Sequence, residues 1–147
     1  MQHFPEIRQA NDGERGSAVV EFVFLGLVLL VPVIYFVLTV GQLQAGSFAV
    51  VGAADQAAKI YVTAGSAPDA TAQARQAALL VLNDFGFDPA SAKIDIRCSG
   101  DCLTPGSSVT VEVRLGVSLP LLPGSRGVAD SAVAVEASAT QLVERFR

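Results

Sequence analysis

A continuous apolar run near the N-terminus dominates the pattern of hydrophobic and polar positions in this chain. Nineteen residues without a charge extend from Phe22 to Val40. A helix rising about 1.5 Å per residue would make this run roughly 28 Å long, close to the hydrocarbon thickness of a bilayer. The run is also longer than the apolar core of a secretory signal, which has about 7–15 residues. The pattern therefore predicts a membrane-spanning helix, in which Pro32 forms a packing kink.

The helical pattern continues beyond the apolar run and becomes amphipathic. We therefore expect a single helix of roughly 45 residues over residues 17–63, apolar on all sides in its first half and on one side in its second. Gly41, Gly46 and Gly52 weigh against its continuity, because glycine is a poor helix former. The predicted apolar face of the second half comprises Leu43, Val50, Val51, Ala54, Ala58, Tyr61 and Val62.

A second, shorter helix follows the first. Gly65 is expected to end the first helix, and Ser66-Ala67-Pro68-Asp69 resembles a capping box that opens the next one. Gly86 stands where a C-terminal capping glycine is expected. The predicted apolar stripe of this helix comprises Ala70, Ala74, Ala77, Ala78, Val81 and Phe85.

Beyond Pro89 the apolar positions alternate with a period of two, which is typical of strands. Residues 93–98 and 109–117 are predicted to form an antiparallel pair, with a bulge at Gly116. Residues 119–124 are predicted to form an apolar loop. Residues 131–142 are predicted to form a third strand, although their repeated alanines leave a helix open as the alternative.

Taken together, these elements predict an α+β fold in which a long apolar helix, a short helix and a small antiparallel sheet follow one another. The chain has 147 residues, of which 51% are hydrophobic, and its mean hydropathy is +0.47. The residues outside the apolar run suffice for one modest core. From Gly41 onward there are eight Lys or Arg and ten Asp or Glu, a net charge of −2. This balance gives no indication of nucleic-acid binding.

The two cysteines lie close together, with three residues between them, in Cys98-Ser-Gly-Asp-Cys102. A metal site needs about four ligands, and the only histidine, His3, precedes the apolar run. A disulfide closing a tight loop is therefore the preferred interpretation, with two free thiols as the alternative. A location outside the cytoplasm would permit such a disulfide.

Few residues indicate chemistry. Neither a Ser-His-Asp nor a Cys-His set can form without a histidine beyond the N-terminal segment, and no glycine-rich phosphate-binding motif is present. The pairs Asp84/Asp88 and Asp95/Asp101 are imaginable as metal or acid–base groups, but such carboxylates are usually solvated. We therefore expect no enzyme activity, no cofactor and no metal.

One motif resembles a known family. Residues 14–22, Glu-Arg-Gly-Ser-Ala-Val-Val-Glu-Phe, directly precede the apolar run. They are similar to the N-terminus of the TadE-like pseudopilins, minor components of the tight-adherence (Tad/Flp) type IV pili of bacteria. The resemblance covers about residues 14–45. It implies a cytoplasmic leader over residues 1–16, a transmembrane helix over residues 17–40 and a pilin-like extracytoplasmic domain over residues 41–147.

The resemblance also implies how the chain is processed and assembled. A prepilin peptidase would cut between Gly16 and Ser17, and Glu21 would then pair with the new N-terminal amine of its own or a neighbouring subunit. The implied partners are other pilin subunits, the Tad assembly platform in the membrane, the peptidase and inner-membrane lipid. The N-terminus would lie inside, which Arg15 also favours, and the C-terminal domain outside.

Two other classes remain open. The chain would keep residues 1–16 if it were an extracytoplasmic interaction module held by a single membrane anchor. It would lose the apolar run if it were a secreted protein cut near Ser47-Phe48-Ala49.

Overall fold

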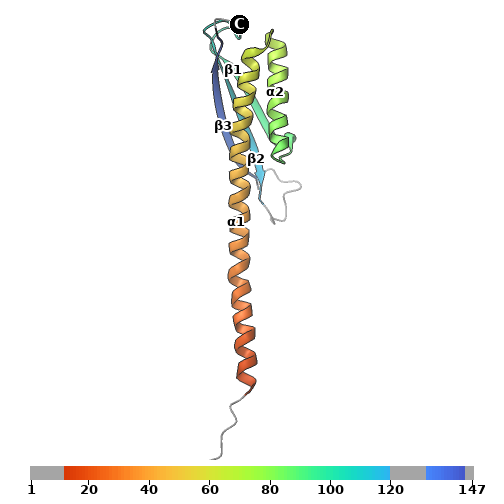
Figure 1. Ribbon diagram of the computed structural model, residues 1–147, viewed down its shortest axis with the longest axis vertical. Coiled ribbons are helices and arrows are strands. Elements are labelled where there is room, and N and C mark those ends of the chain that lie inside the picture. The colour runs from red at the N-terminus through yellow and green to blue at the C-terminus, as the bar shows by residue number, and fades with distance from the viewer. Residues whose placement is uncertain (1–11, 120–131, 145–147) are drawn as a thin grey trace, which may run out of the picture. The chain divides into compact units, whose positions relative to one another are not determined.

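The computed structural model describes residues 12–119 and 132–144 and has the predicted α+β fold (Figure 1). The chain divides into two compact units, residues 1–37 and residues 38–147, and the first helix belongs to both. The elements are the helices α1 (Asp12–Thr63) and α2 (Ala67–Asp84), the 3-10 turn η1 (Pro89–Ser91), and the strands β1 (Ala92–Cys98), β2 (Ser108–Ser118) and β3 (Ala132–Leu142).

Helix α1 runs without a break through 52 residues. It contains Pro32 and the three glycines that weighed against continuity, and it starts five residues before the expected Ser17. Proline removes one backbone hydrogen-bond donor, and glycine raises the conformational entropy of the unfolded chain. Neither ends a helix that has many backbone hydrogen bonds on each side. The expected end near residue 63 is confirmed.

Helix α2 begins with the predicted capping arrangement. The Asp69 backbone N–H donates to Ser66 Oγ over 3.4 Å, and the Ser66 hydroxyl donates to Asp69 Oδ2 over 2.6 Å. At the other end, Gly86 has a φ of +81° and the Phe87 N–H donates to the Leu82 carbonyl over 3.0 Å. Glycine adopts this left-handed conformation without a side-chain clash, which allows the chain to turn away from the helix.

The three strands form an antiparallel sheet of order β1-β2-β3. Residues 132–142 are a strand, so the helical alternative is excluded there. The predicted bulge is wrong, because Gly116 lies opposite Ala134 in an unbroken register. Partial burial of one face and hydrogen bonding to β2 outweigh the low strand propensity of alanine in β3.

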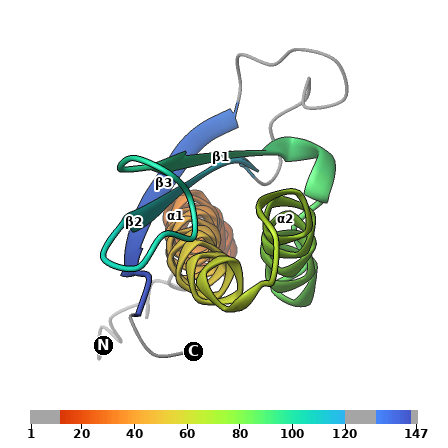
Figure 2. The same ribbon diagram turned by 90° about the horizontal axis from the view of Figure 1, so that it is seen from above.

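Both helices cover the same face of the sheet (Figure 2). The sheet contributes the alternate residues of β2, all almost completely buried: Val109, Val111, Val113, Leu115 and Val117. The α1 side of this core comprises Ala49, Val50, Ala53, Ala54, Ala57, Ala58 and Tyr61, and the α2 side comprises Ala70, Ala74, Ala78 and Leu82. Small side chains on the helices therefore meet branched side chains on the strand.

Two large residues of the predicted apolar faces are exposed. Val51 is 57% exposed and Phe85 is 48% exposed. Helix α2 also packs against α1, so the buried side of α1 is rotated away from the predicted stripe. It includes Ala49, Ala53 and Ala57, and it leaves Val51 outside. In α2 the buried large residue is Leu82, whereas Phe85 follows the last helical turn.

Candidate functional sites: the Glu21 segment and the disulfide loop

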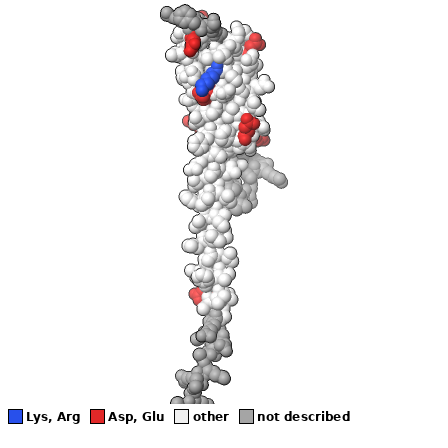
Figure 3. Space-filling view, viewed as in Figure 1, with Lys and Arg blue, Asp and Glu red and all other residues white. Residues whose placement is uncertain are grey.

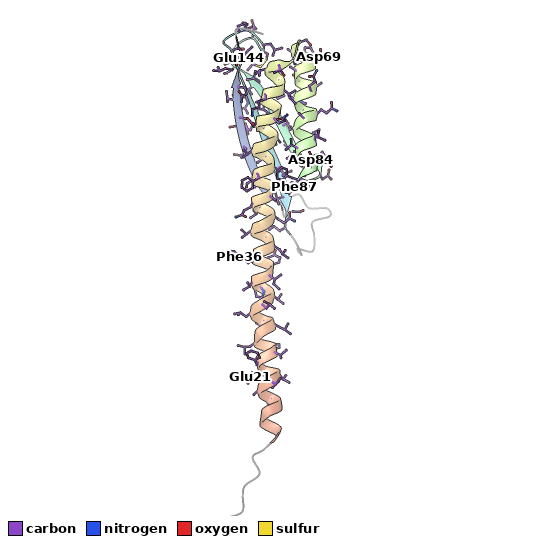
Figure 4. The ribbon with its side chains drawn as sticks, in the orientation of Figure 1. Glu21, Phe36, Asp69, Asp84, Phe87 and Glu144 are labelled. Carbon is purple, nitrogen blue, oxygen red and sulfur yellow. A yellow bond between two sulfur atoms is a disulfide. The ribbon has the colours of Figure 1, made fainter. Side chains whose placement is uncertain are left out.

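The predicted processing and pairing residues all lie near the N-terminal end of α1. Gly16, Ser17 and Glu21 are helical and exposed. Ser17 and Glu21 are four residues apart and so share one helical face. Glu21 is the only charged residue from Gly16 to Ala54. It forms a single acidic spot on an otherwise uncharged stretch of surface (Figures 3 and 4).

The helix that carries Glu21 is the one helix of the described residues that is long and apolar enough to cross a membrane. Its most apolar 18-residue window has a mean hydropathy of 2.8, and none of that window is buried. The largest exposed side chains include Phe22, Leu29 and Phe36. A continuous apolar surface of this size needs lipid or other apolar helices around it.

The second site is the connection between β1 and β2. Cys98 and Cys102 form a disulfide with an S–S distance of 1.99 Å and a Cα–Cα distance of 5.4 Å. The hydroxyl of Tyr61, near the end of α1, lies 3.9 Å from Cys98 Sγ. The loop also contains Leu103 in a left-handed conformation, with a φ of +69°. Neither the Tyr61 contact nor the strained Leu103 backbone has a signal in the sequence.

The same loop is bonded to the segment that follows β3. The Gly106 N–H donates to the Val143 carbonyl and the Val143 N–H donates to the Ser107 carbonyl, both over 2.9 Å. Gly106 has a φ of +89°, which favours glycine. The disulfide loop, the end of α1 and the chain after β3 therefore support one another at this end of the sheet.

The acidic pairs considered as catalytic or metal groups do not form a centre. Asp88 accepts from the Ala90 backbone N–H over 2.9 Å and so caps η1. Asp95 lies exposed on β1, across from Glu112 of β2. Within residues 12–119 and 132–144, no group of three or more His, Cys, Asp or Glu side chains could hold a metal ion. Residues 120–124 of the predicted apolar loop lie outside the described residues, and Leu119 is half-buried.

The solvent face of the sheet carries a row of alternating charges that the sequence analysis missed. Arg97 of β1 lies 3.4 Å from Glu112 of β2, and Arg114 lies 3.6 Å from the same residue. Arg114 also lies 2.6 Å from Glu136 of β3. The contacts of Arg97 with Glu112 and of Arg114 with Glu136 cross between strands and depend on the register, which cannot be read from any one strand.

Comparisons with protein-family models, with curated proteins and with solved structures found no match.

Proposed function

We propose that this chain is a TadE-like minor pseudopilin that a prepilin peptidase processes and that a Tad-type (Flp) type IV pilus system assembles in the cytoplasmic membrane. The observation that carries the proposal is the position of Glu21. It is the only charged residue from Gly16 to Ala54 of a long, exposed apolar helix, and it lies five residues after Gly16.

An ionisable residue in a membrane segment is costly and usually has a function. Cleavage after Gly16 creates an amine at Ser17 that is largely positive at neutral pH. A pair between this amine and Glu21 offsets the cost of placing each charge among apolar helices. If the amine and the carboxylate belong to neighbouring subunits, the pair also fixes how far one helix is shifted along the other.

The second half of α1 supports the proposal in another way. The same helix that leaves the apolar segment becomes the central helix of the outer unit, where it packs on the sheet. An anchor of this kind is part of the folded domain. The disulfide agrees with an outer unit in an oxidising compartment.

The test is the intact mass and N-terminal sequence of the protein extracted from its native membrane. The proposal predicts a chain that starts at Ser17. It also predicts that Gly16→Val blocks cleavage and that Gly26→Val does not. These two glycines are matched, since an added Cβ meets nothing within 4 Å at either position.

A chain that starts at Met1 would contradict the proposal and support the alternative of an anchored module without processing. A soluble product that lacks the apolar run would support the secreted alternative. The proposal also fails if Gly16→Val is cleaved normally, because the peptidase would then not recognise Gly16 as part of its cleavage site.

A further inference from the structure

The sheet has two open edges, and we propose that β3 of one copy pairs with β1 of a second copy to continue the sheet from chain to chain. Strand β2 lies between β1 and β3. The backbone N–H and C=O groups of each outer strand are therefore bonded to β2 on one side and face outward, unpaired within the sheet, on the other. Within the described residues, no backbone hydrogen bond is made from the outer side of β1 or β3. Each edge is therefore able to accept a strand.

Strand β3 lacks the features that normally protect an edge. Such features are short length, proline, lysine, an inward charge or a bulge. β3 has eleven residues in unbroken register and contains neither proline nor lysine. Its single charged residue, Glu136, lies on the solvent face of the sheet. It is also rich in small side chains, which leave room for larger side chains on a neighbouring strand.

The topology fixes the direction of the new pair. Both outer strands are antiparallel to β2, so β1 and β3 are parallel to each other within one chain. Two copies that stand side by side in the same orientation therefore bring β3 of one and β1 of the next together as a parallel pair. Pairing of β3 with β3 in the antiparallel sense would require one copy to be inverted.

The side chains fix the register. When Lys93 of one copy lies beside Glu136 of the next, the inward residues Ile94 and Ile96 lie beside Ala137 and Ala139. Large side chains then neighbour small ones on the helix-covered face. On the solvent face, Asp95 neighbours Ser138 in this register.

The charges of the two edges are complementary in this arrangement. The solvent face of β1 carries Lys93, Asp95 and Arg97, a net charge of +1, whereas that of β3 carries only Glu136. In its own sheet Lys93 lies across from Arg114, a pair of like charges that a second carboxylate would relieve. Arg114 binds Glu136 through Oε2, so another cation can approach Oε1 from the open side.

This contact joins two different surfaces, so it is heterologous and can repeat without limit if the rotation between copies does not close a ring. It rests on the sheet edges alone and does not depend on cleavage after Gly16. It would therefore stand if the proposed pilus function failed.

Cysteine cross-linking of the full chain in its native membrane tests the proposal. One copy carries Asp95→Cys and a second, co-expressed copy carries Ser138→Cys. Neighbouring strands lie about 4.8 Å apart, within the range that a disulfide spans. In one chain these positions are separated by Glu112 of β2, so a bond between them reports contact between copies. We expect a mixed dimer on mild oxidation and no dimer from either single variant expressed alone.

Matched controls test the register and the charges. Thr140 lies two residues further along the same face. When Thr140→Cys is used in place of Ser138→Cys, we expect a severalfold lower yield of the mixed dimer. Lys93→Glu should lower the Asp95–Ser138 yield severalfold, and adding Glu136→Lys in the partner copy should restore it. Both charges are on the solvent face, so these variants test pairing without opening the core.

Three outcomes would overturn the proposal. The first is a mixed dimer no more abundant than with the unsubstituted chain. The second is a dimer from Ser138→Cys alone, which would mean that β3 pairs with β3. The third is a higher yield through Thr140→Cys, which would exclude the pair of Lys93 and Glu136.

Discussion

Gly46 of α1 lies directly against Val117 of β2. A Cβ atom at residue 46 would lie only 2.7 Å from Val117 Cγ2, and 3.3 Å from Val135 Cγ2 of β3. An added Cβ fits into this contact only if the valine side chains, the strands or the helix move. Gly46 weighs against a continuous helix in the sequence, but in the structure it allows the helix to approach the sheet closely.

This contact leads to a first prediction. Gly46→Ala should lower the free energy of unfolding by about 1–3 kcal/mol, because the added methyl group overpacks the core. Gly52→Ala is the matched control, since its Cβ would meet only Val81 at 3.5 Å, an ordinary contact. The control should keep its stability or gain up to about 1 kcal/mol from helix propensity. Urea titration of the full chain in detergent, followed by tyrosine fluorescence, to which the buried Tyr61 contributes, measures both. Equal effects of the two variants would contradict the proposed close packing at Gly46.

Two leucines of α2 give a second matched pair. Leu82 is completely buried and Leu80 is 61% exposed. Leu82→Ala should cost about 2–5 kcal/mol, because it removes apolar contacts and leaves a cavity. Leu80→Ala should stay within about 0.5 kcal/mol of the parent chain. The same urea titration distinguishes them, and a large loss for Leu80→Ala would show that its exposed side chain has a partner in the detergent-solubilised protein.

The disulfide gives a third prediction. Replacing both Cys98 and Cys102 by serine should lower stability by about 2 kcal/mol, since a loop this short restricts the unfolded chain only modestly. The fold should persist, because β1 and β2 pair along the whole length of β1. Treating the parent chain with a reductant should reproduce the stability of the double variant. A much larger loss than this would mean that the Tyr61 contact and the loop conformation also depend on the disulfide.

The charge in the apolar helix gives a fourth prediction, which rests on the proposed function. Glu21→Gln keeps the size of the side chain and removes its charge, so it should leave membrane insertion unchanged and reduce incorporation into assembled pilus complexes. Insertion is measured by resistance to alkaline extraction, and assembly by co-purification with other pilus subunits. Asp55→Asn is the control, because Asp55 lies on the same helix but pairs with Lys59 over 2.6 Å. Normal assembly of Glu21→Gln would exclude the pairing with the Ser17 amine.

Local signals in the sequence predicted the order and type of the elements. The Ser66 cap, the turn at Gly86 and the alternation along β2 each depend on neighbouring residues, and each is present in the structure. The alanine-rich β3 was harder to predict, because its strand conformation comes from pairing with β2. Gly116 was assigned a bulge from residue type alone, and the observed register shows that none is needed.

The errors in the predicted core have one physical cause. A helical stripe in the sequence shows which residues are apolar, but it does not show how many neighbours the helix has. Helix α1 packs against both the sheet and α2, so its buried sector is wider than a single stripe and includes Ala49, Ala53 and Ala57. Val51, which is larger and more apolar than these alanines, remains exposed. The charge row on the solvent face was missed for a related reason, since it joins three strands.

The alanine surface of α1 has a consequence for how this core can vary. The buried side of the helix supplies little volume of its own, and the valines of β2 fill the space between helix and sheet. Substitutions that enlarge the helix side have no free space to occupy, whereas strand positions can exchange one branched side chain for another of similar size. Sequence divergence among folded variants of this chain should therefore concentrate in the strands, and saturation mutagenesis should recover mainly Gly, Ala and Ser at the inward alanine positions of the helix.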